Sequence, residues 1–189
     1  MRIGILGGTF NPVHIGHLIL AEGAIEQLGL SKVIFIPAYL PPHKELKSKI
    51  TAEQRYHMVK LITFSNPLFE ASRLEIIRKG RSYTVDTLRR LREKFGLKQR
   101  IFFITGSDCL GRLSFWKEKK EIFKLAEFVI AARPDYPLKN IPRRTRLIKI
   151  APVDISSSDI RKRLKSKKSI RYLVPDAVRN YIVKNKLYC

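Results

Sequence analysis

Two histidines, His14 and His17, stand three residues apart and follow the glycine pair Gly7-Gly8. The glycines end a short apolar run, and a second apolar-rich segment follows the first histidine. If the run is a strand and the segment a helix, both histidines lie at the start of that helix and project to one side of it. Phosphate groups bind at helix N-termini that lie at the carboxyl end of a sheet. These residues therefore predict a phosphate site.

Three interpretations compete for the histidine pair. A zinc site would have histidines four residues apart beside a Glu, or further Cys and His ligands, and the remaining histidines are His43 and His57. The pair could also be ordinary cap or surface residues. The third interpretation is that both donate hydrogen bonds to a polyphosphate and to charge that develops in a transition state. The glycine spacing fits neither GxGxxG nor GxxxxGK[ST], so the two commonest nucleotide loops are excluded. We favour the third interpretation and expect no metal ligands.

The elements that must position these residues alternate along the chain. Short apolar runs suited to buried parallel strands are separated by amphipathic segments. This alternation predicts a doubly wound, Rossmann-like α/β fold, with a mostly parallel sheet flanked by helices. The length fits a single domain over residues 1–189, with a helical C-terminal portion over about 156–189. The predicted strands are 2–6, 32–38, 68–76, 100–106, 127–132 and 146–153.

Local signals mark where several helices begin and where the alternation stops. Thr51 to Gln54 and Ser156 to Asp159 resemble capping boxes, and Pro175 suits the first turn of a final helix. We predict further helices over 85–95 and 156–165. The proline-rich segment 37–50 and the basic segment 142–146 are predicted to be surface loops.

The chain is strongly basic, with 38 Lys and Arg against 16 Asp and Glu and a formal charge of +22. Such a charge predicts a polyanionic partner, which could be nucleic acid, a membrane surface or a phosphorylated small molecule. The two cysteines form no CxxC pattern and predict no disulfide framework. No run of about 20 apolar residues predicts a membrane span. We expect a protein of the reducing cytoplasm with no membrane partner.

The opening motif also carries a family resemblance. GGTFNPVHIGH, residues 7–17, resembles the (H/T)xGH signature of the nucleotidyltransferase superfamily, whose members move a nucleotidyl group from a nucleoside triphosphate to a phosphate acceptor. Four later segments resemble bacterial nicotinate mononucleotide adenylyltransferases, in the same order and over nearly the whole chain: 41–44 (PPHK), 74–88 (LEIIRKGRSYTVDTL), 106–108 with Trp116, and 155–161 (ISSSDIR). The SYTxDTL element separates this family from phosphopantetheine adenylyltransferases and cytidylyltransferases.

The resemblance implies a reaction. ATP and nicotinate mononucleotide would give deamido-NAD (nicotinate adenine dinucleotide) and pyrophosphate, a step of NAD biosynthesis, with Mg²⁺ carried by the ATP phosphates. His14, His17 and Arg161 would be the catalytic residues. One alternative is a sister enzyme that prefers nicotinamide mononucleotide. A distant alternative is a nucleic-acid-binding protein, because segments 142–146 and 161–168 are basic, although no nucleic-acid motif is present. Weak RNA association could accompany catalysis, and the oligomeric state stays open.

The end of one predicted strand and the start of one predicted helix supply the rest of the expected ATP site. Gly106 and Asp108 follow a predicted strand, where a plain turn is the alternative. The serines at 156–158 open a helix with an arginine one turn later, which suits a triphosphate, with simple N-capping as the alternative. The residues expected to bind ATP are Gly7, Gly8, Thr9, Phe10, His14, His17, Gly106, Asp108, Ser156, Ser157, Ser158 and Arg161.

A third helix start is expected to bind the acceptor. The free N–H groups around Ser82 to Thr84 favour an anion, and nicotinate carries a carboxylate whereas nicotinamide does not. Helix capping and, for Trp116, core packing are the alternatives. The resemblance implies acceptor contacts by Lys44, Ser82, Tyr83, Thr84, Asp108, Trp116 and Arg133. Two positions depart from the family: Asn11 stands where many relatives have Asp, and Lys117 where some carry a second aromatic residue.

Overall fold

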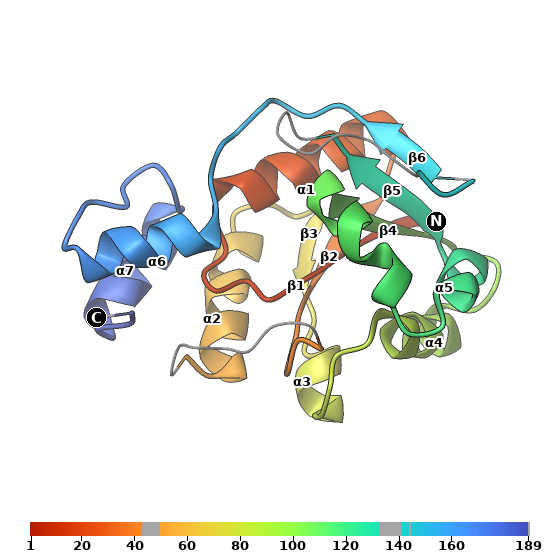
Figure 1. Cartoon of the computed structure of the whole chain (residues 1–189), viewed down its shortest axis with the longest axis horizontal. Coiled ribbons are helices and arrows are strands. Elements are labelled where there is room, and N and C mark those ends of the chain that lie inside the picture. Colours follow the sequence, from red (N-terminus) through yellow and green to blue (C-terminus); the bar gives the residue numbers. More distant parts are fainter. Residues whose placement is uncertain (43–49, 133–140, 144, 189) are drawn as a thin grey trace.

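A computed structural model describes residues 1–42, 50–132, 141–143 and 145–188 (Figure 1). Within them, six strands form one sheet in the order β3-β2-β1-β4-β5-β6, and every neighbouring pair is parallel. The predicted doubly wound α/β fold is therefore confirmed. The strands are β1 (Arg2–Gly8), β2 (Lys32–Pro37), β3 (Phe69–Ala71), β4 (Arg100–Gly106), β5 (Glu127–Ala131) and β6 (Thr145–Ile148).

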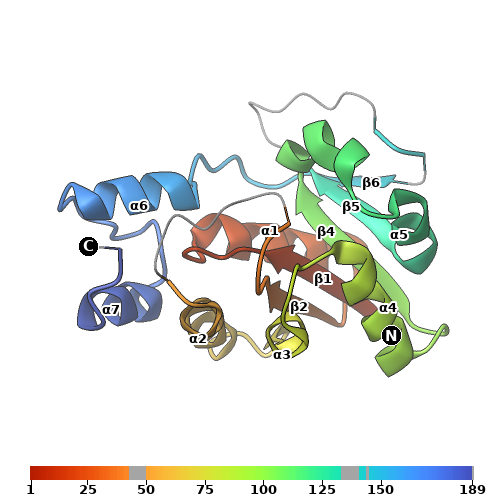
Figure 2. The same cartoon turned by 60° about the horizontal axis from the view of Figure 1, so that its bottom comes forward.

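Helices cover both faces of this sheet, as a parallel sheet with two buried faces requires. Figures 1 and 2 place α6 and α7 together at one end of the molecule and α4 and α5 at the other. The α-helices are α1 (Ile15–Leu28), α2 (Ala52–Thr63), α3 (Leu74–Arg78), α4 (Thr84–Phe95), α5 (Lys119–Leu125), α6 (Ser157–Lys165) and α7 (Asp176–Lys184), and a 3₁₀ helix, η1, spans Ser107–Phe115.

Alternate residues of the strands feed two separate apolar cores. In β4, Phe102 and Ile104 face a core shared with α1, α2, α6 and α7, whereas Ile101 and Phe103 face a core shared with α4 and α5. Since successive side chains of a strand point to opposite faces, the continuous apolar run in β4 supplies both cores. The C-terminal helices share the first core with the sheet through residues such as Ile160.

Most predicted element boundaries agree with the structure, and three do not. The predicted strand 146–153 corresponds to β6 and already ends at Ile148. The predicted strand 68–76 ends at Ala71, because the chain turns into the short helix α3, where Glu75 and Ile76 are buried. The predicted loop 142–146 overlaps β6, which begins at Thr145 because Thr145 and the residues after it pair with β5. The capping box at Thr51 and the N-cap at Ser156 are confirmed by their hydrogen bonds.

The strand order reverses between β1 and β4, which are direct neighbours in the middle of the sheet. To one side of this point the chain proceeds to β2 and β3, and to the other side to β5 and β6. Open α/β sheets bind ligands in the crevice at the carboxyl ends of the strands at such a switch point. Gly7-Gly8 and Gly106 end these two strands. The fold therefore brings both predicted glycine segments to one crevice.

Candidate active site

Two glycines at the ends of the β1–α1 connection, Gly8 in β1 and Gly16 in α1, lie close to aromatic rings. A Cβ at Gly8 would lie 3.1 Å from the ring of Phe10, and a Cβ at Gly16 would lie 3.2 Å from the ring of His14. Phe10 itself adopts a positive φ of 48° and packs its ring against His17. The side chain of Phe10 is buried, so any ligand at this position would meet its backbone.

His14 and His17 form a compact pair at the start of α1. The backbone N–H of His14 donates to Nδ1 of His17 over 3.2 Å, and the two ring centroids are 3.8 Å apart. Because Nδ1 of His17 accepts this hydrogen bond, the proton of the neutral imidazole sits on Nε2. The fold thus prepares His17 as a neutral donor at Nε2.

Helix α6 holds the loop that precedes the histidines. Arg161 donates from Nη1 to the carbonyl of Asn11 over 2.8 Å, and the Ser157 hydroxyl donates to the carbonyl of Pro12 over 2.8 Å. Ser156 is the N-cap of α6, and Ser158 lies 3.3 Å from Arg161 Nη2. The predicted serine cluster therefore contacts the loop that leads into His14. The hydroxyls of Ser156 and Ser157, however, already form hydrogen bonds within the protein.

The C-terminal segment reaches the same loop through Tyr188, which sequence reasoning did not select. Its hydroxyl donates to Oδ1 of Asn11 over 2.7 Å in a buried hydrogen bond. Burial raises the pKa of Tyr188, so the hydroxyl keeps its proton at neutral pH. The side chain of Asn11 is thereby turned into the protein and away from solvent.

Replacing Tyr188 by Phe is expected to lower the free energy of unfolding by about 2 kcal/mol, because a buried hydrogen bond between Tyr188 and Asn11 would be lost. Urea denaturation followed by circular dichroism measures this difference. Tyr172→Phe is the matched control, since the Tyr172 side chain is 81% exposed and its loss of a hydroxyl should change little. Equal stability of the two variants would contradict the role of this hydrogen bond.

Arg55, on α2, is a second buried residue that the sequence analysis passed over. Its guanidinium is fully buried and donates to the carbonyl of Thr9 over 2.8 Å and to that of Tyr39 over 3.0 Å. Burial lowers its pKa. It could have been noticed, because it lies on the same helical stripe as Met58, Val59 and Ile62. Arg55 joins the glycine turn to the loop that follows β2.

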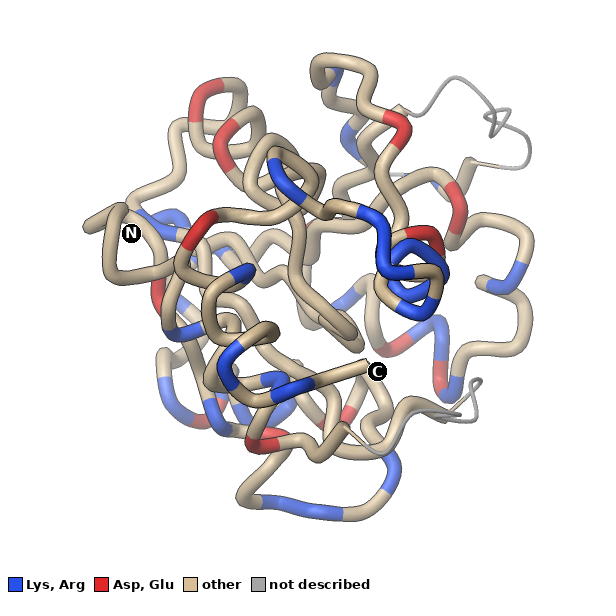
Figure 3. Tube along the Cα trace, turned by 90° about the vertical axis from the view of Figure 1, so that its left-hand side faces the viewer, with Lys and Arg blue, Asp and Glu red and all other residues tan. Residues whose placement is uncertain are grey.

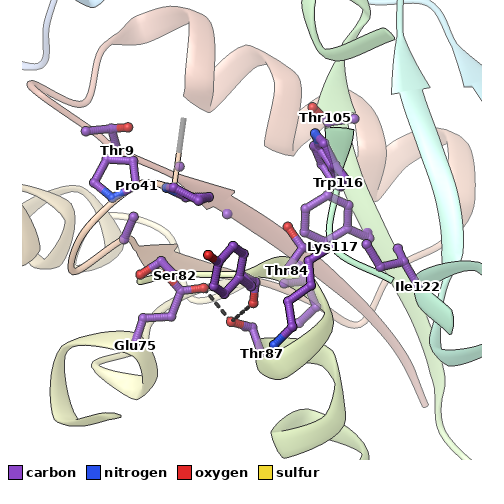
Figure 4. Close-up of a pocket in the computed structure, with 17 residues that line it drawn as sticks. Thr9, Pro41, Glu75, Ser82, Thr84, Thr87, Thr105, Trp116, Lys117 and Ile122 are labelled. Carbon is purple, nitrogen blue, oxygen red and sulfur yellow. Dashed lines mark hydrogen bonds between the residues drawn. The ribbon is translucent and has the colours of Figure 1, made fainter. Parts of the chain in front are cut away.

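A cavity of about 190 Å³ opens beside this turn, on the α4 side of the sheet (Figure 4). Gly7, Gly8 and Thr9 form one wall, and the opposite wall carries Trp116 and Lys117. Its remaining walls come from β1, the loop after β2, α3, the start of α4, β4 and α5. The other described lining residues are Ile5, Ala38, Pro41, Pro42, Glu75, Ser82, Tyr83, Thr84, Thr87, Phe103, Thr105 and Ile122.

The predicted anion turn at Ser82 to Thr84 lies in this cavity, with Tyr83 as the N-cap of α4. The Ser82 hydroxyl accepts from the Tyr39 N–H over 2.9 Å and also binds the buried carboxyl of Glu75. Glu75 accepts a further hydrogen bond from Thr87 (Figure 4), and burial raises its pKa. The Ser82 side chain is thus engaged within the protein, and the N–H groups of Ser82 and Tyr83 donate to the carbonyls of Leu40 and Arg81. A ligand would therefore meet the first N–H groups of α4, from Thr84 on.

Trp116 is positioned by two aromatic residues of the sheet. Its ring meets Phe103 edge-on at 5.8 Å and Phe128 at 6.0 Å between centroids. The indole is only partly buried and lines the cavity. It therefore combines the two alternatives of the sequence analysis, since it packs on the core and still borders the cavity.

The remaining predicted residues lie at the end of β4 or outside the described residues. Gly106 is buried at the end of β4, and Asp108 is exposed in η1. Neighbouring Cys109 is a poor nucleophile, because burial raises the pKa of its thiol to about 11. Lys44 and Arg133 lie outside the described residues.

Comparison with known proteins places this site in a family. The Cytidylyltransferase-like family model matches residues 5–163. The chain is 46% identical over 188 residues, all of both chains, to a probable nicotinate-nucleotide adenylyltransferase of Thermus thermophilus. It is 43% identical to that of Moorella thermoacetica, over 99% of this chain and 91% of the relative. This chain belongs to the cytidylyltransferase-like family, among the nicotinate-nucleotide adenylyltransferases.

A solved member of the adenylyltransferases has the same fold. Plasmodium falciparum nicotinic acid mononucleotide adenylyltransferase, complexed with NaAD, aligns with a TM-score of 0.81 at 22% identity, over 99% of this chain and 97% of that one. A second structure of that protein, complexed with APC, aligns with a TM-score of 0.79. The likeness confirms the Rossmann-like architecture on which the site is built.

The surface of this adenylyltransferase family member is basic around its C-terminal helices. Figure 3 shows Lys and Arg outnumbering Asp and Glu on that side of the molecule. Several of them follow Arg161 on α6, namely Lys162, Arg163 and Lys165. Within the described part of the chain, no helix has the length and apolar character that crossing a membrane requires.

Proposed function

We propose that this chain transfers the adenylyl group of ATP to nicotinate mononucleotide, giving deamido-NAD and pyrophosphate. The observation that carries the proposal is the meeting of two half-sites at Gly7, Gly8 and Thr9. On one side lie the histidine pair and the start of α6, and on the other the cavity with Trp116 and the α4 turn. The family membership supports the same reaction.

The acceptor would occupy the cavity. Its pyridine ring would lie against Trp116, and its carboxylate would receive N–H groups at the start of α4, where the helix dipole favours negative charge. The predicted contacts of Lys44 and Arg133 with the acceptor phosphate remain part of this proposal. Asp108, exposed after β4, would hold ribose hydroxyls beside Gly106.

The chemical step would be a direct displacement. An oxygen of the acceptor 5′-phosphate attacks the α-phosphorus of ATP in line, and the bond from that phosphorus to the bridging oxygen of the β-phosphate breaks. No covalent enzyme intermediate is required. His14 and His17 would donate hydrogen bonds to the phosphates as charge develops, and Arg161 with the start of α6 would hold the departing pyrophosphate.

Magnesium would reach this site with ATP. Within the described residues, no three His, Cys, Asp or Glu side chains gather where they could hold a metal ion. Mg²⁺ is often bound through substrate phosphates and water with few protein ligands. The described residues are compatible with that mode of binding, because it requires no cluster of acidic or histidine side chains. The ion would neutralise phosphate charge. We also propose a cytoplasmic location, as the cysteine content predicts.

One assay tests the function. Pyrophosphate release is measured with ATP and either nicotinate or nicotinamide mononucleotide, and we expect kcat/KM to favour the nicotinate form by at least about tenfold. The reason is that the α4 turn offers hydrogen-bond donors and a positive dipole to a carboxylate. Equal use of both acceptors would refute the assigned role of this turn. Release with neither acceptor would refute the reaction.

A further inference from the structure

Lys117 occupies a position in the cavity that the family resemblance does not explain. Its side chain extends from beside Trp116 towards Thr87 and the start of α4 (Figure 4). Its ammonium nitrogen lies 4.9 Å from the centre of the Tyr83 ring, and Tyr83 is the N-cap of α4. The cation therefore stands between the aromatic wall and the anion turn.

Charged neighbours outside the cavity lining hold Lys117 there. Its Nζ donates to both carboxylate oxygens of Asp86 over 3.3 and 3.4 Å and lies 3.9 Å from Glu118. Arg89 pairs with the same two acids. The four groups balance in charge, but of the four only Lys117 lines the cavity. A ligand in the cavity would therefore lie closest to the positive charge of Lys117.

The other charged group in the cavity does not cancel this effect. Among the described lining residues, Lys117 is the one cation and Glu75 the one acid. Glu75 is buried and accepts hydrogen bonds from Ser82 and Thr87, and burial raises the pKa of its carboxyl. Lys117 is partly exposed, with 43% of its side chain accessible. It can therefore move towards a ligand, whereas Glu75 is fixed within the wall.

We propose that Lys117 is a specificity-determining residue that selects the nicotinate over the nicotinamide form of the acceptor. The proposal rests on the proposed function. A pyridine ring against Trp116 with its substituent at the α4 turn would bring that substituent beside the ammonium. A carboxylate gains Coulomb attraction there, and a neutral amide does not. A cation thus contributes selectivity at the position where some relatives carry an aromatic residue.

The test is the ratio of kcat/KM for nicotinate mononucleotide to that for nicotinamide mononucleotide. Replacing Lys117 by Met is expected to lower this ratio about tenfold, between the effects of an exposed and a buried ion pair. The loss should appear as a higher KM for the nicotinate form. Lys117→Arg keeps the charge and should keep most of the ratio. Lys120→Met is the matched control, because Lys120 is exposed on α5 and does not line the cavity.

A second variant, Asp86→Asn, distinguishes a role of Lys117 in selecting the acceptor from a purely structural role. If Lys117 only joins the segment after η1 to α4 through Asp86, both substitutions should impair both acceptors alike and leave the ratio unchanged. If Lys117 selects the carboxylate, Asp86→Asn frees the ammonium and should keep or raise the ratio. An unchanged ratio in folded Lys117→Met enzyme would overturn the inference. Wild-type protein that releases no pyrophosphate with nicotinate mononucleotide would instead overturn the proposed function.

Discussion

Replacing His17 by Ala is expected to lower kcat by a factor on the order of 10²–10³, as loss of one preorganised oxyanion donor does in other enzymes. The imidazole is fixed before substrate arrives, since its Nδ1 accepts from the His14 N–H and its ring packs on Phe10. No reorganisation of this donor is then required during the reaction. Alanine removes the Nε2–H donor and also the Nδ1 acceptor of the His14 N–H at the start of α1.

Steady-state pyrophosphate release at saturating ATP and nicotinate mononucleotide measures this effect. His57→Ala is the control, because His57 stacks on Tyr181 at 4.5 Å, between α2 and α7, and lines no part of the cavity. His17→Gln should recover part of the rate, since its amide can donate a hydrogen bond. Near-normal kcat in His17→Ala would show that the histidine is not a catalytic donor.

The residues around His17 show why the glycine turn could be predicted from sequence. Strand, glycine pair and helix are consecutive, so short-range spacing fixes where the histidines project. The same holds for the Thr51 and Ser156 caps, whose partners lie three residues away. Buried strands such as β4 can also be predicted from sequence, because burial on both faces requires a continuous run of apolar residues.

Contacts between distant segments could not be predicted in this way. Tyr188 meets Asn11 across 177 positions of the chain, and no local pattern indicates that pairing. The predicted strand 68–76 contains β3 but extends too far for a related reason. The segment 74–78 is apolar enough for a strand, but it folds as α3 and buries Glu75 beside Thr87. Tertiary contacts decided between the two structures.

Arg55→Met is expected to destabilise the protein by about 3 kcal/mol, because the carbonyls of Thr9 and Tyr39 would lose a charged donor. A buried charge can be replaced without loss where an apolar residue leaves no polar group unsatisfied. That exception fails here, since methionine offers these two carbonyls no donor. Urea denaturation measures the difference, and Arg73→Met, on an exposed ion pair with Glu53, should cost at most about 1 kcal/mol.

The same substitution should also affect both substrates in the enzyme that remains folded. Thr9 belongs to the glycine turn, where the two proposed half-sites meet, and Tyr39 belongs to the loop that leads into the cavity, so Arg55 holds these two segments together. Without it, KM should rise for ATP and for nicotinate mononucleotide together, whereas a Lys117 substitution raises only the latter. Wild-type stability in Arg55→Met would mean that other groups can satisfy both carbonyls. A change confined to one substrate would show that Arg55 supports one half-site and does not join the two.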